Sequence, residues 1–141
     1  MRSSSRALFA AAVAAVLVVL TPTAAFAAYY GRETDYAANW APADVDQHWT
    51  CKGMTGVLVC FTGFGDYIKV YDDKSDGYAA AADWDDVDSS RSGSCVSKLG
   101  SGSRGTCSKN FTEGHTIRLR AARYNSGNPV DHSAWIDINV S

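Results

Sequence analysis

Four cysteines constrain the fold of this 141-residue chain more than any other feature. An even number of cysteines in a short chain is typical of exported domains that are held together by disulfides. Three pairings are possible, and we favour the one in which each bond closes a short glycine-containing segment able to fold back on itself. The predicted bonds are Cys51–Cys60 and Cys95–Cys107. A zinc site is disfavoured, because the chain has no C-x-x-C motif and its three histidines lie far apart in sequence.

The N-terminal residues indicate export. An unbroken apolar run from Ala7 to Leu20 follows Arg2 and Arg6, and Ala25-Phe26-Ala27 comes after it. A positive segment, an apolar segment and an A-x-A site together are typical of a secretory signal peptide, and the apolar run is too short to span a bilayer as a helix. We therefore expect residues 1–27 to be a signal peptide, cleaved after Ala27 or one residue later. The mature protein is expected to be secreted and extracellular.

Removal of residues 1–27 leaves 114 residues, which is enough for one small domain and too few for a multi-domain enzyme. The loss of Arg2 and Arg6 leaves 11 basic residues against 15 acidic ones, a net charge of −4. This balance does not favour nucleic acid as a partner. The mature chain has no second apolar segment of membrane-spanning length, so no membrane contact is expected after cleavage.

Residues 51–141 carry the pattern of short β-strands. Between residues 66 and 71, for example, Ile68 and Val70 alternate with Tyr67, Lys69 and Tyr71. Turn-forming residues separate such segments at intervals typical of an antiparallel sandwich or barrel. We therefore predict an all-β fold, a small antiparallel β-sandwich or barrel with two disulfides. The segments with strand character are 57–61, 66–71, 78–84, 115–124 and 134–140.

Residues 28–50 precede this domain and show no clean period, apart from a weak helical spacing through Tyr36, Trp40 and Ala43. The segment is unusually rich in aromatic residues, whereas a mobile leader is usually poor in them. Two interpretations remain open. The rings either pack on their own domain, or they form an extension that docks into a partner. The aromatic residues are Tyr29, Tyr30, Tyr36, Trp40 and Trp49.

Charge is segregated along the chain. Eight acidic residues lie between Asp66 and Asp88, and seven basic residues lie between Arg91 and Arg123. The two groups either neutralise each other across the sheet or form a bipolar surface that orients a charged partner. An improvised calcium site remains a minor alternative for the acidic group. Its candidate ligands are Asp83, Asp85, Asp86 and Asp88.

Motifs that resemble catalytic or cofactor sites are weak. The G-x-G-x-x-G match at Gly100–Gly105 has no following helix and is interpreted as the tip of a hairpin, so no dinucleotide cofactor is expected. No G-x-S-x-G or H-E-x-x-H motif occurs. The one dyad that can be drawn combines His115 and His132 with Asp131. We therefore predict a non-enzymatic protein with no metal and no cofactor.

Two stretches of the sequence are familiar when taken together: residues 65–84, which begin GDYIKVYDDKSDG, and residues 91–120, which contain RSGSCVSKLGSG, GTCSKNFTEG and IRLR. The pattern resembles a group of small secreted actinobacterial β-domain proteins. It is most similar to the adaptor (UmbB-type) subunits of umbrella toxin particles. The resemblance covers about residues 51–141.

The resemblance implies an adaptor that links a repeat-containing toxin to a lectin subunit in an antibacterial particle. One partner would bind the β domain and the other the N-terminal extension, with Tyr29, Tyr30, Tyr36 and Trp40 as candidate anchors. Two alternatives stay open. A secreted protease inhibitor could present the disulfide-bracketed loop from Lys98 to Arg104, and a cell-wall-associated hydrolase could use the histidine dyad.

Overall fold

The computed structural model describes residues 28–40 and 48–141; the predicted signal peptide lies outside this range. The described chain folds into β-strands without a helix, so no helix in it could cross a membrane. The strands are β1 (Glu33–Tyr36), β2 (Thr50–Met54), β3 (Val57–Thr62), β4 (Tyr67–Asp72), β5 (Ala79–Asp86), β6 (Ser92–Val96), β7 (Arg104–Ser108), β8 (Thr116–Asn125), β9 (Asn128–His132) and β10 (Ile136–Asn139).

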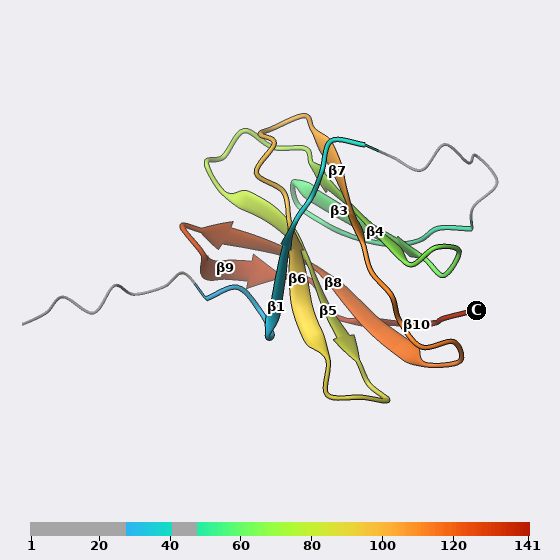
Figure 1. The fold of residues 1–141 in the computed structure, drawn as a ribbon. Coiled ribbons are helices and arrows are strands. Elements are labelled where there is room, and N and C mark those ends of the chain that lie inside the picture. Colours follow the sequence, from blue (N-terminus) through green and yellow to red (C-terminus); the bar gives the residue numbers. More distant parts are fainter. Residues whose placement is uncertain (1–27, 41–47) are drawn as a thin grey trace, which may run out of the picture.

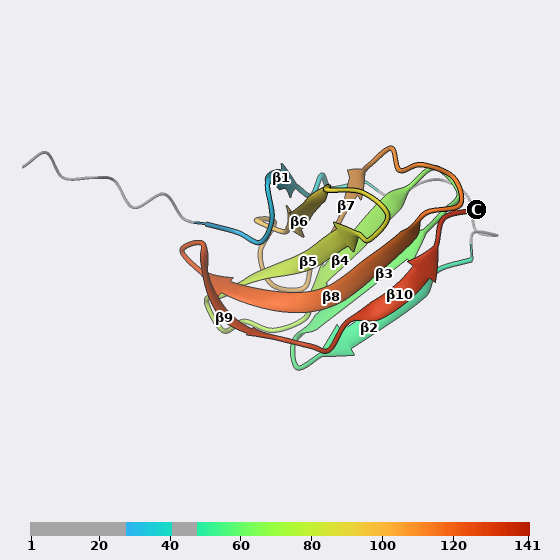
Figure 2. The same cartoon turned by 90° about the horizontal axis from the view of Figure 1, so that it is seen from below.

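The strands form two sheets that pack face to face (Figures 1 and 2). One sheet has the order β1-β6-β5-β8-β10, with β9 also paired to β8, and the other has the order β2-β3-β4-β7. Every pairing between strands is antiparallel except that of β1 with β6. The prediction of an all-β sandwich is therefore confirmed, and it is an open sandwich of two sheets.

The core lies between the two sheets, and the alternation seen in the sequence builds it. In β4, Ile68 and Val70 are fully buried, while Lys69 between them lies on the outer face. The six-stranded sheet contributes Trp84 and Leu119, both fully buried. Burial of side chains of this size provides most of the free energy that favours folding. The other large core residues are Val59, Phe61, Phe111 and Ile117.

Both predicted disulfides are present, and they connect different parts of the fold. Cys51–Cys60 joins directly opposite residues of β2 and β3 within one sheet. Cys95–Cys107 joins β6 to β7, so it crosses the core and connects the two sheets. The expectation of a hairpin between Cys95 and Cys107 is therefore wrong: residues 97–103 pass from one sheet to the other. Two disulfides fit an oxidising environment.

The N-terminal segment closes one side of the sandwich. Strand β1 pairs with β6 in the first sheet, and two residues later Ala38 forms a bridge with Thr106 of β7 in the second. Gly105 makes room for this crossing, because a Cβ atom there would lie 2.5 Å from that of Ala37. The helical spacing through Tyr36 does not produce a helical turn there, since Tyr36 is the last residue of β1. Ala43, which completed the spacing, lies outside the described residues.

The sequence prediction missed strand β9, which forms a hairpin with β8. The turn between them has positive φ at both Ser126 and Gly127, as a tight two-residue hairpin requires. After a break around Ser133, the chain continues as β10. This strand pairs with the same edge of β8 that β9 uses. This break places Trp135 on the outer face of the six-stranded sheet, beside Arg120.

Candidate functional site

The four predicted anchors of the N-terminal segment separate into two pairs. Tyr29 and Tyr30 pack on the outer face of the six-stranded sheet. The ring of Tyr29 lies edge-on to Tyr124 with 5.0 Å between centroids, and the Tyr30 hydroxyl donates to Asp85 at 2.7 Å. Tyr36 and Trp40 are 54% and 43% exposed. Part of the segment therefore packs on its own domain, as one interpretation expected, and docking of the exposed Tyr36 and Trp40 into a partner stays a prediction.

A buried carboxylate lies beneath Tyr29 and Tyr30. Asp83 has no exposed surface, and it accepts hydrogen bonds from Ser94 at 2.8 Å, from the Tyr124 hydroxyl at 2.8 Å and from Arg120 at 3.0 Å. Desolvation raises the pKa of Asp83, although these donors and the arginine oppose the shift. Burial and the bond to Asp85 likewise raise the pKa of Tyr30 to about 12. This network fixes residues 29 and 30 to the sheet.

Part of the charge segregation seen in the sequence is removed by the pairing of strands. Acidic residues of β5 pair with basic residues of β8: Asp83 lies 3.0 Å from Arg120, and Asp85 lies 3.4 Å from Arg118. Asp76, in the loop before β5, pairs with Arg123 at 2.8 Å. Antiparallel pairing of β5 with β8 brings the two groups together. Mutual neutralisation across the sheet therefore holds for these three arginines, whereas Arg91 and Lys109 pair with Glu33 of β1 instead.

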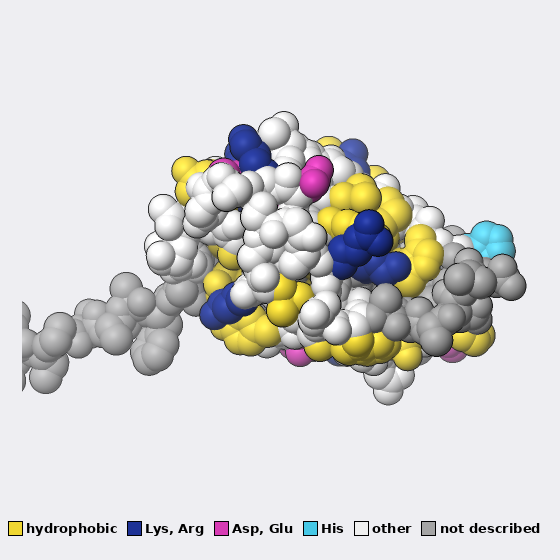
Figure 3. All heavy atoms as spheres, turned by 90° about the horizontal axis from the view of Figure 1, so that it is seen from above, with side chains coloured by type: hydrophobic (Ala, Val, Ile, Leu, Met, Phe, Trp, Pro, Cys, Tyr) yellow, Lys and Arg dark blue, Asp and Glu magenta, His cyan; other side chains and the backbone are white. Residues whose placement is uncertain are grey.

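The outer face of the four-stranded sheet carries a different kind of surface, which we call the Trp40 surface. It is defined by Trp40, Trp49, Tyr67, Lys69, Tyr71 and Arg104. Figure 3 shows basic side chains set among hydrophobic ones on the face seen from above. Trp40 lies edge-on to Tyr67, with 5.3 Å between ring centroids. Lys69 Nζ lies 3.8 Å from the centre of the Trp49 ring, and the Arg104 guanidinium lies 4.6 Å from that of Tyr71.

Strand register explains how these residues meet. Tyr67, Lys69 and Tyr71 alternate along β4 and so point to the same side. In the neighbouring β7, Thr106 is directly opposite Lys69, and Arg104 is directly opposite Tyr71. Side chains at opposite positions of an antiparallel pair touch. The sequence prediction identified the β4 alternation but missed Arg104 as its partner, because pairing between β4 and β7 joins segments more than 30 residues apart.

A pocket of about 220 Å³ lies within the Trp40 surface. It is lined by Asn39, Trp40, Lys69, Tyr71, Arg104 and Thr106. Thr106 is only 2% exposed, and its hydroxyl oxygen has no hydrogen-bond partner among the described residues. The pocket is smaller than the roughly 300 Å³ at which small-molecule sites usually begin. Its size suits one side chain of a partner better than a cofactor.

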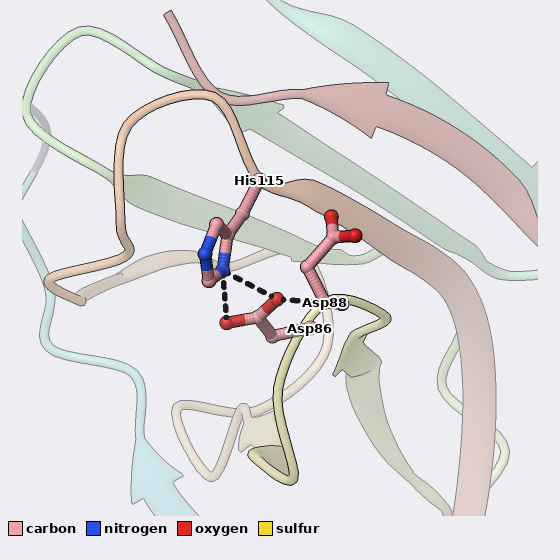
Figure 4. Close-up of side chains that lie close together, drawn as sticks. All are labelled: Asp86, Asp88 and His115. Carbon is pink, nitrogen blue, oxygen red and sulfur yellow. Dashed lines mark hydrogen bonds and ion pairs between the residues drawn. The ribbon is translucent and has the colours of Figure 1, made fainter.

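A second cluster lies where β5 ends, at Asp86. His115 Nδ1 is 2.9 Å from one oxygen of Asp86 and 3.0 Å from the other, with Asp88 beside them (Figure 4). Their donor atoms lie within 4.8 Å of one another, so this is the one group with metal-ligand spacing in the part of the chain that the structure describes. Both oxygens of Asp86 also accept bonds, from Asp88 N and from the Ser89 hydroxyl.

The catalytic dyad drawn from the sequence is not assembled. His115 faces Asp86, whereas Asp131 accepts two hydrogen bonds from Arg123, and His132 Nδ1 lies 3.0 Å from the carbonyl oxygen of Ser133. The four acids named as a calcium site are also divided. Asp83 and Asp85 pair with arginines, and only Asp86 and Asp88 lie together.

A comparison of this chain with family models, curated proteins and solved structures finds no match. The roles of its residues therefore rest on geometry and chemistry. Exposed tryptophan and tyrosine rings beside basic groups provide large, rigid contact areas and charge-assisted hydrogen bonds, a combination suited to holding another protein.

Proposed function

We propose that this protein is a secreted, non-enzymatic binding module that acts as an adaptor, linking a repeat-containing toxin to a lectin subunit in an antibacterial particle. The observation that carries the proposal is the Trp40 surface, where Trp40 is 43% exposed beside Lys69 and Arg104. Tryptophan, tyrosine and arginine are the residues most enriched among those that dominate binding energy in protein interfaces. The resemblance of residues 51–141 to adaptor subunits supplies the identity of the partners.

The N-terminal segment supports a role with two partners, because it presents rings on two sides of the molecule. Trp40 lies over the four-stranded sheet. Tyr36 lies beside the six-stranded sheet, where Lys98 Nζ is 4.1 Å from the centre of its ring. A second hollow of about 540 Å³ opens there, lined by Tyr29, Tyr36, Lys98 and Tyr124 among others. A connector needs two such surfaces that can be occupied at the same time.

The protease-inhibitor alternative receives less support from the loop on which it depends. Its two basic side chains both stack on rings of the same molecule, Lys98 on Tyr36 and Arg104 on Tyr71. The loop is also bonded to the end of β4, since Gly102 N donates to the carbonyl oxygen of Asp72 at 2.6 Å. A basic residue that enters a protease pocket must leave its own surface, which both stacked side chains oppose.

Affinity capture from the medium of the producing organism tests the proposal. Tagged wild-type protein is expected to recover a repeat-containing toxin and a lectin subunit, identified by mass spectrometry. Trp40→Ala is expected to lose one of them and to keep the other. Phe64→Ala is the matched control, because Phe64 is 68% exposed and lies outside the Trp40 surface. Recovery of the protein alone would overturn the adaptor proposal.

A further inference from the structure

We propose that the pocket between Lys69, Arg104 and Thr106 binds a carboxylate, supplied by an aspartate or glutamate in a segment of the protein partner. This inference deepens the proposed function and rests on it, because it names the chemistry that the Trp40 surface recognises. The pocket combines two basic groups, a buried hydroxyl without a hydrogen-bond partner among the described residues, and aromatic walls.

Two basic side chains line the pocket. Lys69 and Arg104 both line it. No ion pair between either of them and an acidic side chain occurs within residues 28–40 and 48–141. Burial and the nearby charge of Arg104 both lower the pKa of the Lys69 ammonium. Two like charges held in a partly dehydrated pocket repel each other, and an anion placed between them removes that repulsion.

Thr106 supplies the third group. Its side chain is almost completely buried, and its hydroxyl has no hydrogen-bond partner among the described residues although it lines the pocket. A buried hydroxyl without a partner destabilises the folded state. A carboxylate has two oxygens with several acceptor sites and can accept bonds from an ammonium, a guanidinium and a hydroxyl together. The donor set therefore fits this anion.

The remaining walls indicate that the anion belongs to a protein and not to an acidic polysaccharide. Trp40 and Tyr71 line the pocket beside the two basic groups, so the residues that flank the acid in the partner meet apolar surface. Binding of a polyanion depends on a wide basic field, and the mature chain has 15 acidic residues against 11 basic ones. A single acidic side chain with apolar neighbours fits both the aromatic walls of the pocket and the absence of a net positive charge.

Nuclear magnetic resonance titration at constant ionic strength tests the pocket directly. The probe is N-acetyl-aspartate, followed through the Arg104 Nε–H and Thr106 N–H signals of the 28–141 protein. Saturable shifts are expected in the wild type. Lys69→Gln is expected to weaken binding about tenfold or more, because one charge-assisted bond is lost. Thr106→Val is expected to weaken it less. Lys52→Gln, which changes a lysine on β2 of the same sheet, is the matched control.

Absence of saturable shifts, or shifts that Lys69→Gln leaves unchanged, would overturn the inference. Tighter binding of a heparin hexasaccharide than of the aspartate probe would also overturn it, in favour of a polysaccharide ligand. Failure of the adaptor proposal would look different: affinity capture would recover no partner, while the pocket would still bind the probe in the wild type and lose it in Lys69→Gln.

Discussion

Lys109 Nζ lies 2.9 Å from Oε2 of Glu33, and this contact ties the N-terminal edge strand β1 to the loop that follows β7. The lysine side chain is only 5% exposed and also contacts Asp35 at 2.5 Å. Arg91 donates two further bonds to the Glu33 carboxylate, at 2.8 and 3.0 Å. Strand β1 is therefore held by charge on one side as well as by its ladder with β6.

The Glu33 contacts predict a pH dependence of stability. The bonds from Arg91, with those from Lys109, lower the pKa of Glu33 to about 2, from an ordinary value of 4.5. A carboxyl group whose folded pKa is lowered stabilises the protein above its ordinary pKa, and this contribution is lost as the pH falls toward 2. At pH 7 we expect Glu33→Gln to lower the free energy of unfolding by about 1 kcal/mol, since a third of the side chain is exposed to solvent screening.

Urea unfolding at several pH values between 7 and 2 measures this effect. The difference between wild type and Glu33→Gln is expected to shrink between pH 4.5 and 2. Glu113→Gln serves as the control, because Glu113 is exposed. A difference that stays constant over the whole range would show that the charge of Glu33 plays no part.

The two disulfides are expected to contribute unequally. Both close short loops, with sequence separations of 9 and 12, so the chain-entropy contribution is about 3 kcal/mol for each. Cys95–Cys107 lies in the core between the sheets, whereas Cys51 is exposed. Replacing Cys95 and Cys107 by alanine should lower the free energy of unfolding by about 1 kcal/mol more than replacing Cys51 and Cys60, because it also leaves a cavity in the core. Urea unfolding of the two double mutants compares them, and an equal or larger loss for Cys51 and Cys60 would contradict the prediction.

Asp83 is expected to be the most sensitive carboxylate of β5. Asp83→Asn should lower the free energy of unfolding by about 3 kcal/mol, because the amide adds donors where Ser94, Tyr124 and Arg120 already donate, and it leaves the arginine without its partner. Asp85→Asn is the control on the same face of the strand, and we expect about 1 kcal/mol because its ion pair is half-exposed. Thermal unfolding ranks the two, and a loss for Asp85→Asn as large as that for Asp83→Asn would contradict this view.

The cluster of His115, Asp86 and Asp88 is expected to act as a clamp between the β5–β6 loop and the start of β8. Its carboxylates already accept bonds from His115, Ser89 and two backbone groups. His115→Ala should therefore lower Tm, by the equivalent of about 1 kcal/mol. Millimolar Zn²⁺ or Ca²⁺ and the chelator EDTA should leave the wild-type Tm unchanged. A rise in Tm with Zn²⁺ that disappears in His115→Ala would instead identify a metal site.

Local pattern was enough to predict half of the described strands and both disulfides. Strands β3, β4, β5, β8 and β10 were expected from alternation, which depends only on neighbouring residues. Strand β9 was missed because its sequence, NPVDH, has little apolar alternation and depends on pairing with β8. The site was only partly predicted. Trp40 was named from its aromatic neighbours, whereas Arg104 and Thr106 acquire their place from the pairing of β7 with β4.

The sequence by itself determined an all-β domain with two short-range disulfides, because side-chain alternation and cysteine spacing are local properties of the chain. Only the tertiary structure decided that acids of β5 pair with arginines of β8, that the N-terminal segment belongs partly to the sheets, and that Lys69 and Arg104 line one pocket. These outcomes depend on which strands become neighbours. Strand order follows from the best burial of the whole core, which no single segment of the sequence encodes.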